Sequence, residues 1–159
     1  MILSKSCIYG IRAAMYIATQ EGRKFIPIKE VSEKLDISFH FLTKILQELT
    51  KSEIMVSYRG PSGGIGLARP AEQITLYNIV EVLECSGIFT DCILGLPGCG
   101  QLTPCPLHEK WGKSREEVKS IFTQTTLAEL SRDITRLNLR LTGNDPGCEV
   151  KPKNNFKFY

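Results

Sequence analysis

Residues 28–49 read I-K-E-V-S-E-K-L-D-I-S-F-H-F-L-T-K-I-L-Q-E-L, with apolar residues at helical spacing on both sides of a short polar break. The pattern predicts one helix over residues 28–35 and a second over residues 39–49. Residues 36–38 form the turn, and the Ser38 hydroxyl is suited to cap the second helix. Two helices joined so tightly predict a helix-turn-helix, although any helical hairpin has this pattern. The apolar stripes would comprise Ile28, Val31 and Leu35 in the first helix and Leu42, Ile45, Leu46 and Leu49 in the second.

A two-stranded hairpin is expected directly after these helices. Residues 53–58 and 65–68 have strand character, and the segment between them reads R-G-P-S-G-G, which is rich in turn formers. A hairpin that follows a helix-turn-helix and carries one arginine, Arg59, at its tip is typical of the wing of a winged helix. An ordinary hairpin turn is the alternative. We therefore expect a mainly α-helical fold with a small β-wing.

Four more helices are predicted from apolar spacing. They cover residues 5–20, residues 76–83 after a capping Thr75, residues 108–123, and a last segment that starts at Thr126. Their apolar faces would comprise Ile8, Ile11, Ala14, Met15 and Ala18 in the first, Leu76, Ile79, Val80 and Leu83 in the second, Trp111, Val118, Ile121 and Phe122 in the third, and Leu127, Leu130, Ile134, Leu137 and Leu141 in the last.

This order of elements predicts four parts. A winged helix-turn-helix domain would occupy residues 1–84, a cysteine-rich loop residues 85–107, and a pair of helices residues 108–142. The polar segment 143–159 contains two prolines and two glycines and is expected to be a flexible tail.

The start of the second helix is the candidate DNA-reading surface. In helix-turn-helix proteins these residues meet base edges in the major groove. Arg59 suits a narrow minor groove, and the glycines of the wing let its backbone approach phosphates. The alternatives are a solvated helix face and, for Phe41, core packing. The candidate DNA contacts are Ser38, His40, Phe41, Thr43 and Lys44 on the helix and Arg59, Gly60, Ser62, Gly63 and Gly64 on the wing.

The segment 91–108 reads D-C-I-L-G-L-P-G-C-G-Q-L-T-P-C-P-L-H and carries the candidate ligands Cys92, Cys99, Cys105 and His108. Glycine and proline disfavour regular structure, so the loop can fold around a bound group. Wide Cys-x6-Cys-x5-Cys-x2-His spacing favours an iron–sulfur cluster over zinc, whose ligands commonly include a Cys-x2-Cys pair. A zinc site and a metal-free thiol switch stay open.

The other cysteines have simpler interpretations. Cys7 and Cys85 are expected to pack in the interior, since free cysteines are usually buried. Cys148 lies in the expected tail and is interpreted as a bystander.

Composition sets limits on the function. The 159 residues are 42% hydrophobic and 23% charged with a net charge of +3, as in an ordinary globular protein. No stretch resembles a membrane span or secretion signal, so a cytoplasmic protein with reduced thiols is expected. With only two histidines and no acid/base pair apparent, we expect neither an enzyme nor a small-molecule substrate.

Two stretches together resemble the Rrf2 family of winged-helix transcription regulators, which includes the IscR, NsrR and CymR branches. The resemblance spans the chain to about Leu141. Its most specific parts are I-S-F-H-F-L at residues 37–42 and Y-R-G-P-S-G-G at residues 58–64, similar to the family's recognition helix and wing, which adds Tyr58 to the DNA-binding candidates. The three-cysteine loop at residues 91–108 is the second stretch that carries the resemblance.

The resemblance implies a homodimer that binds a roughly palindromic site in double-stranded DNA. It also implies a cluster on Cys92, Cys99, Cys105 and His108, with 2Fe–2S favoured and 4Fe–4S possible, and a dimer formed by the helix after the loop. Three positions depart from the IscR and other branches: six residues separate the first two cysteines, Thr43 replaces a glutamate, and Ile8 replaces an acid.

The sequence thus predicts a transcription regulator whose DNA affinity follows the state of an iron–sulfur cluster that senses iron, nitric oxide or redox state. The alternative is a metal-free or zinc-clipped winged-helix module that binds a partner protein and has a thiol redox switch. A fall of duplex binding with rising salt would favour the DNA-binding hypothesis, because phosphate contacts release counterions.

Overall fold

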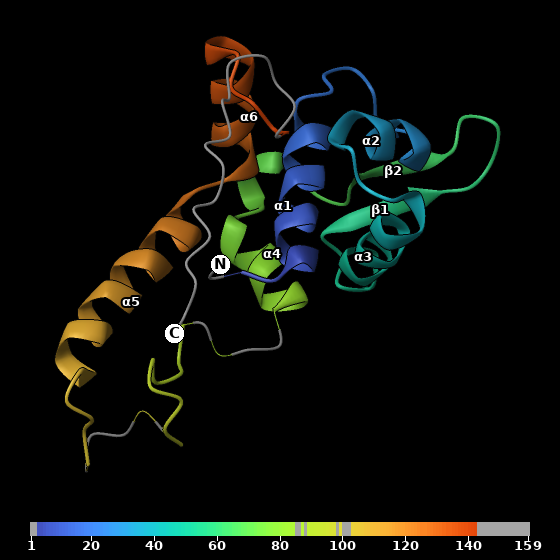
Figure 1. Ribbon diagram of the computed structural model, residues 1–159. Coiled ribbons are helices and arrows are strands. Elements are labelled where there is room, and N and C mark those ends of the chain that lie inside the picture. The colour runs from blue at the N-terminus through green and yellow to red at the C-terminus, as the bar shows by residue number, and fades with distance from the viewer. Residues whose placement is uncertain (1–2, 85–86, 88, 98, 100–102, 143–159) are drawn as a thin grey trace, which may run out of the picture.

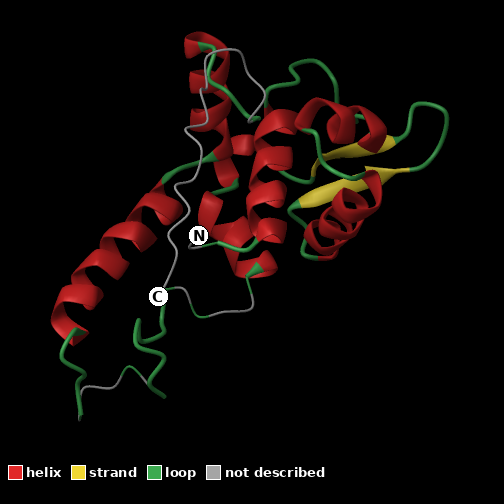
Figure 2. Cartoon of the chain, in the orientation of Figure 1, coloured by secondary structure: helices red, strands yellow, loops and turns green. Residues whose placement is uncertain are grey.

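The computed structural model describes residues 3–84, 87, 89–97, 99 and 103–142. Helices dominate, and the described residues contain one two-stranded sheet (Figure 2). The predicted class, mainly α with a β-wing, is confirmed. In chain order the elements are α1 (Lys5–Ala18), α2 (Ile28–Leu35), α3 (Phe39–Lys51), β1 (Met55–Tyr58), β2 (Gly64–Leu67), the short 3₁₀ turn η1 (Ala71–Gln73), α4 (Leu76–Leu83), α5 (His108–Gln124) and α6 (Leu127–Leu137).

The turn between α2 and α3 is fixed by its own hydrogen bonds. Asp36 adopts the left-handed conformation that ends α2, with φ 52° and ψ 52°. The buried Ser32 hydroxyl donates to the Ile37 carbonyl at 2.6 Å and so joins α2 to the turn. Ser38 occupies the N-cap position of α3, but its side chain makes no capping hydrogen bond, so the predicted role of its hydroxyl is wrong.

The wing pairs β1 with β2 in antiparallel register, from Met55 opposite Leu67 to Tyr58 opposite Gly64. Its connecting loop extends away from the helices (Figure 1). Ile26, in the segment between α1 and α2, adds an isolated bridge to Ile65. This bridge ties the base of the wing to the chain that leads into α2.

Helix α1 lies at the centre of the first domain and contacts α2, α3, α4 and α6. The predicted apolar face is partly wrong. Ile8, Ile11, Met15 and Ala18 are only half-buried, and small side chains take the most buried places. The reason is close packing: a Cβ added at Gly10 would meet Leu83 and Ile45. The buried residues of α1 are Cys7, Gly10, Ala13, Ala14 and Ile17.

After α4 the chain passes through the cysteine loop into α5, which extends away from the first domain (Figure 1). Helix α6 then returns to α1, and an antiparallel bridge joins Thr126 to Thr75. The predicted stripe of α6 is wrong at its end, because Asn138 ends the helix in the left-handed conformation and Leu137 is exposed. Leu141 lies beyond the helix, where Arg12 donates to its carbonyl at 2.6 Å.

Three predictions concern residues outside the described part of the chain: the tail at 143–159, the packing of Cys85 and the bystander role of Cys148. Within the described part, no helix is both long enough and apolar enough to cross a bilayer.

Candidate functional site

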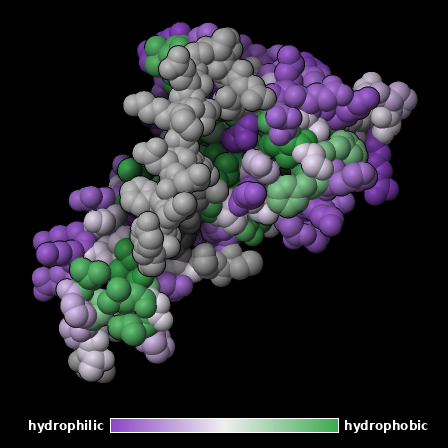
Figure 3. Space-filling view, viewed as in Figure 1, coloured by the Kyte–Doolittle hydropathy of each residue, from purple (hydrophilic) through white to green (hydrophobic). Residues whose placement is uncertain are grey.

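The cysteine loop encloses a small cavity of about 140 Å³. Its wall contains all four side chains that the sequence singles out as ligands, contributed by positions up to 16 residues apart. Hydrophobic residues gather on the surface at this end of the molecule (Figure 3), where Ile93, Leu94 and Leu96 are each about half exposed. The lining residues are Cys92, Leu96, Pro97, Cys99, Thr103, Cys105 and His108.

The four candidate ligands approach each other in two pairs. The Sγ atoms of Cys92 and Cys105 are 3.6 Å apart, and Cys99 Sγ lies 3.5 Å from His108 Nδ1. Two ligands of one tetrahedral metal would be separated by about 3.8 Å for two sulfurs and about 3.5 Å for sulfur and nitrogen, given bonds of about 2.3 and 2.0 Å. Among the described residues, no three His, Cys, Asp or Glu side chains converge as a single metal ion would require. The two ligand atoms of each pair are therefore about as far apart as two ligands of one metal ion.

The thiols of the first domain and of the loop differ in their electrostatics. Burial, assisted by the nearby Glu84 carboxylate, raises the pKa of the Cys7 thiol to about 12. The pKa of the Cys92 thiol is lowered, chiefly by a backbone hydrogen bond from Leu94 and against the effect of burial. Cys7 is fully buried, as predicted.

Helix α5 holds the start of the loop through two side chains that sequence reasoning did not assign to the site. The Trp111 indole N–H donates to the Asp91 carbonyl at 3.0 Å. Arg115 donates from Nη1 to the Thr90 carbonyl at 2.9 Å and to that of Asp91 at 3.4 Å. All three bonds end on the two residues immediately before Cys92. The only hint in the sequence is the spacing of the two residues, one helical turn apart after His108.

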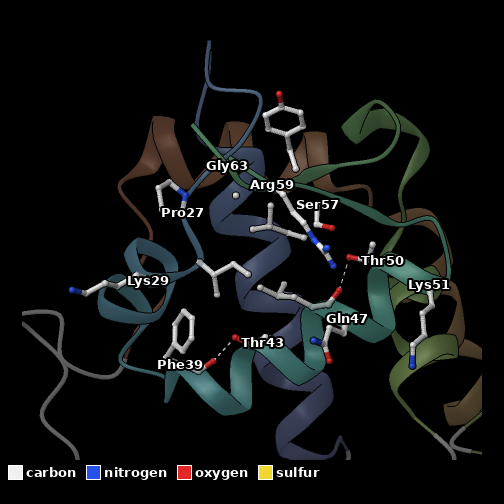
Figure 4. Close-up of a pocket in the computed structure, with 15 residues that line it drawn as sticks. Pro27, Lys29, Phe39, Thr43, Gln47, Thr50, Lys51, Ser57, Arg59 and Gly63 are labelled. Atoms are coloured by element: carbon white, nitrogen blue, oxygen red, sulfur yellow. Dashed lines mark hydrogen bonds between the residues drawn. The ribbon is translucent and has the colours of Figure 1, made fainter. Parts of the chain in front are cut away.

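The second candidate site is a groove of about 620 Å³ between α3 and the wing (Figure 4). Its floor is apolar, and its walls carry three cations, Lys29, Lys51 and Arg59, without an acidic side chain among the lining residues. Lys51 also pairs with Glu48 at 2.8 Å. The Arg59 side chain extends over the groove toward α3 (Figure 4). The lining residues are Pro27, Ile28, Lys29, Phe39, Thr43, Leu46, Gln47, Thr50, Lys51, Ser57, Tyr58, Arg59, Gly63, Gly64 and Ile65.

The structure divides the predicted DNA contacts into two groups. Thr43, Tyr58, Arg59, Gly63 and Gly64 line the groove, whereas the remaining six lie outside it. Those outside are exposed: Ser38, His40, Phe41, Lys44, Gly60 and Ser62.

Two of the predicted contacts on α3 are already engaged within the protein. Phe41 is 37% exposed and meets Tyr9 edge to face at 5.8 Å, so its ring is partly committed to packing. The Thr43 hydroxyl donates to the Phe39 carbonyl at 2.7 Å. It keeps its acceptor lone pairs for a ligand.

Sequence reasoning missed the face of α3 that borders the groove. Phe39, Thr43, Gln47 and Lys51 recur every four residues and share one side of the helix. That spacing was visible in the sequence. Without the position of the wing, however, nothing distinguished this face of α3 from the adjacent faces as a binding surface.

Glycine is required at two positions of the wing. Gly60 has φ 136°, which side chains rarely tolerate, and its carbonyl accepts from the Gly63 N–H at 2.9 Å to close the tip. At Gly64 an added Cβ would collide with the Ile26 carbonyl. The wing thus lies against the chain before α2, with Phe25 stacked on Tyr58 at 5.3 Å.

Comparison with known proteins identifies the family to which the chain is similar. Residues 3–133 match the model of the Rrf2 family, described as an iron-dependent transcriptional regulator. The chain is 31% identical over 130 residues to the HTH-type transcriptional regulator IscR of Sodalis glossinidius, covering 82% of this chain and 78% of that protein. It is 30% identical over 134 residues to NsrR of Oceanobacillus iheyensis, an HTH-type transcriptional regulator, covering 84% and 91%.

Among solved structures, CymR, the global cysteine regulator of B. subtilis, superposes with a TM-score of 0.71. The sequences are 24% identical, and the match covers 82% of this chain and 95% of that one. The likeness establishes a shared fold.

Proposed function

Because the chain belongs to the Rrf2 family of transcriptional regulators, we propose that it is a homodimer whose affinity for its DNA operator depends on an iron–sulfur cluster in the cysteine loop. Membership of this family makes the chain a DNA-binding regulator and not an enzyme. The observation that carries the cluster proposal is the common cavity of Cys92, Cys99, Cys105 and His108.

The two-pair arrangement supports a two-iron cluster as the occupant. Cys92 with Cys105, and Cys99 with His108, each have the separation of two ligands on one tetrahedral metal. A single zinc ion needs all four ligands around one point, and no such group of even three exists among the described residues. The donor set and its spacing therefore fit 2Fe–2S better than zinc.

When bound, the cluster would supply a one-electron redox centre and a reactive target for oxidants or nitric oxide. The three cysteines would hold it as thiolates, and His108 would ligate through an unprotonated ring nitrogen. Loading of the protein should therefore weaken in acid, as protons compete for these ligands. Exchange of a thiolate for imidazole also raises the reduction potential.

For the DNA side, the proposal assigns residues 1–84 to operator binding and residues 108–142 to dimerisation. The exposed residues at the start of α3 would read bases, and the cationic groove would follow a phosphate backbone. No residue of α5 is buried within the described part of the chain, and Ile121 is 59% exposed, which supports a partner on this helix. Two heads related by a twofold axis would require a roughly palindromic operator.

The proposal is tested with anaerobically purified full-length protein. We expect iron and sulfide in equal amounts, visible absorption, and a Mössbauer spectrum of a two-iron cluster with one histidine-ligated iron. Cys99→Ala and Cys105→Ala should abolish the cluster, whereas the control Cys148→Ser should retain it. DNA duplexes enriched from a random pool by the loaded protein should bind the cluster-free protein with a different affinity. Colourless protein without iron or sulfide refutes the cluster proposal.

A thiol switch is the second candidate, and one distance favours it. The sulfurs of Cys92 and Cys105 are 3.6 Å apart, so a small movement would allow a disulfide of about 2.05 Å. Oxidation by a disulfide such as oxidised glutathione would release two reduced thiols for each bond formed. Peptide mapping of colourless protein after this oxidation should then find the pair linked, and a cluster-loaded protein should be protected from it.

A further inference from the structure

Helix α5 and the start of the cysteine loop run side by side in opposite directions. Phe89 meets Phe122 with ring centroids 5.6 Å apart. The next loop residue, Thr90, accepts from Arg115, and the residue after it, Asp91, accepts from Trp111 as well. The contacts advance along the loop as they move back along α5 toward its first residue. Cys92 comes next in the loop, and its cavity includes that first residue, His108.

The guanidinium of Arg115 can donate a further hydrogen bond at this position. Its Nη1 group donates to two backbone carbonyls, but its Nε–H is shielded from solvent and has no hydrogen-bond partner among the residues that the structure describes. Buried donors are nearly always satisfied, so this one points to a missing acceptor. Three thiolate ligands would give a bound cluster a net negative charge that increases by one on reduction. A guanidinium held next to Cys92 is well suited to offset that charge.

We propose that Trp111 and Arg115, together termed the α5 clamp, are positioning residues that hold Cys92 in place and couple the cluster to α5. The inference rests on the proposed function, since it concerns the same cluster. Through the clamp, α5 positions both ends of the ligand set: Cys92 by hydrogen bonds, and His108 as its own first residue. Loss of the cluster removes the link between Cys92 and His108. Helix α5, with its exposed face, then changes its contact with the loop.

The coupling also reaches the first domain. Phe89 precedes the clamped residues and packs with Cys7 and Val80, and its ring lies 5.3 Å from that of Tyr77 on α4. Helix α4 in turn contacts α1 and α3. A change in the position of residues 89–92 is therefore felt by the domain that carries the DNA-reading helix.

Four variants of the full-length protein separate the roles of charge and hydrogen bonding. Arg115→Gln removes the charge and the guanidinium donors, and Arg115→Lys keeps the charge alone. Trp111→Phe removes the indole N–H and keeps a smaller aromatic ring. Lys113→Gln is the matched control, because it removes a cation from an exposed position on the same helix. Their readouts are the midpoint potential of the cluster and the rate of its loss to an iron chelator.

We expect Arg115→Gln to lose its cluster roughly tenfold faster than the parent, as for other residues that orient metal ligands. Its potential should become more negative, because the reduced, more negatively charged cluster loses its counter-charge. A tenfold change in the ratio of reduced to oxidised protein is about 59 mV for one electron. Arg115→Lys and Trp111→Phe should keep the parent potential but lose the cluster faster. Lys113→Gln should match the parent in potential and in the rate of cluster loss.

A measurement on cluster-free protein tests the clamp directly. Trp111 is the only tryptophan, so its indole N–H gives one assignable resonance in a proton–nitrogen spectrum. Its exchange with solvent should be slow in the parent and in Lys113→Gln, and faster in Arg115→Gln, where the loop is held less firmly.

The inference would be overturned if Arg115→Gln matched Lys113→Gln in potential, cluster loss and indole exchange, and if Arg115→Lys and Trp111→Phe matched it in cluster loss. That outcome would leave the proposed function intact. Iron and sulfide analysis of the parent distinguishes the other failure, since a protein that takes up neither overturns the proposed function and the coupling with it. Circular dichroism establishes that each variant retains its helices.

Discussion

The winged helix and the cysteine loop differ in what stabilises them. In the first domain, Leu42 and Leu49 are fully buried, and their neighbours on every side are buried apolar groups. In the loop, Ile93, Leu94 and Leu96 face solvent, and the regular contacts are a few hydrogen bonds, such as those from Gly95 to Cys92 and from His108 to Cys105. The first region orders itself by burial of apolar surface. The second has little apolar burial with which to offset its loss of conformational entropy.

This difference explains how one chain can combine a rigid reader with a responsive element. A segment whose order depends on ligands changes state when the ligand changes, at a cost of a few kcal/mol at most. A packed core does not, because its stability is shared among many contacts. Thiols and leucines occur in both regions, and arginines and threonines occur in the first domain and in the helices after the loop, so each can be used to test the contrast.

The largest difference is expected in thiol reactivity. In cluster-free protein at pH 8, Cys7 should react with iodoacetamide about a thousandfold more slowly than an ordinary thiol, since a pKa of about 12 instead of 9.0 lowers the thiolate fraction by that factor. Cys92, whose pKa is lowered, should react faster than Cys7 by at least as much. Peptide mass spectrometry at timed intervals measures both rates.

The same shift predicts a pH dependence of stability. The pKa of Cys7 is higher in the folded than in the unfolded chain, so its contribution to the free energy of unfolding is complete below pH 9 and declines as the pH rises toward 12.

In 6 M guanidinium chloride Cys7 and Cys92 should react with iodoacetamide at the same rate. Comparable rates in the native protein would show that the thiol of the first domain is accessible.

Matched leucine substitutions should differ next most strongly. Leu42→Ala removes a fully buried side chain and should lower the free energy of unfolding by about 3 kcal/mol. Leu96→Ala removes one that is half exposed, and its effect should stay within about 0.5 kcal/mol. Urea unfolding of cluster-free protein, followed by circular dichroism, measures both. Equal losses would mean that the loop contributes to the folding core.

Arg59→Ala tests the groove at the level of DNA binding. It should weaken binding to specific and random duplex about tenfold and reduce the salt slope by about one, as expected for one lost phosphate contact. Arg136→Ala on α6 is the control, because that guanidinium pairs with Asp133 far from the wing. Fluorescence anisotropy over a salt series measures both variants. An unchanged affinity for Arg59→Ala would remove the wing from the proposed interface.

The contrast also explains which features the sequence could predict. Helices α2 and α4 and the wing follow from local apolar spacing and turn residues, and their predicted bounds agree with the structure within a residue or two. The buried face of α1 was predicted incorrectly because its neighbours, among them Leu83 and Ile45, come from distant parts of the chain. Periodicity contains no information about such partners.

The candidate site divides in the same way. Cysteine spacing singled out the four side chains that share the cavity, since ligand types are visible in a sequence. The Arg115 and Trp111 contacts were not visible, because they depend on the direction in which residues 89–92 run past α5. Their role as a clamp, like the ligand role of the cysteines, stays a proposal for the experiments above to test.

The smallest effect is expected where the first domain joins α6. Thr75 caps α4: its hydroxyl accepts from the Asn78 N–H, and the Asn78 side chain accepts from the Thr75 N–H at 3.0 Å. Thr75→Ala should lower the free energy of unfolding by about 1 kcal/mol. Thr123→Ala, at a hydroxyl that bonds only to helix carbonyls on exposed α5, should change it by less than about 0.5 kcal/mol.

Because Thr75 also bridges to Thr126, loosening this cap should affect the joint between the first domain and α6 before it affects either core. Hydrogen exchange of the Leu76 and Leu127 amides, which bond across the joint to Thr125 and Ile74, should therefore accelerate in Thr75→Ala. Exchange of the Leu46 amide in α3 should increase only as far as global stability falls. If all three amides accelerated equally, the junction would be part of the first domain's cooperative core, and α6 would not open separately from that domain.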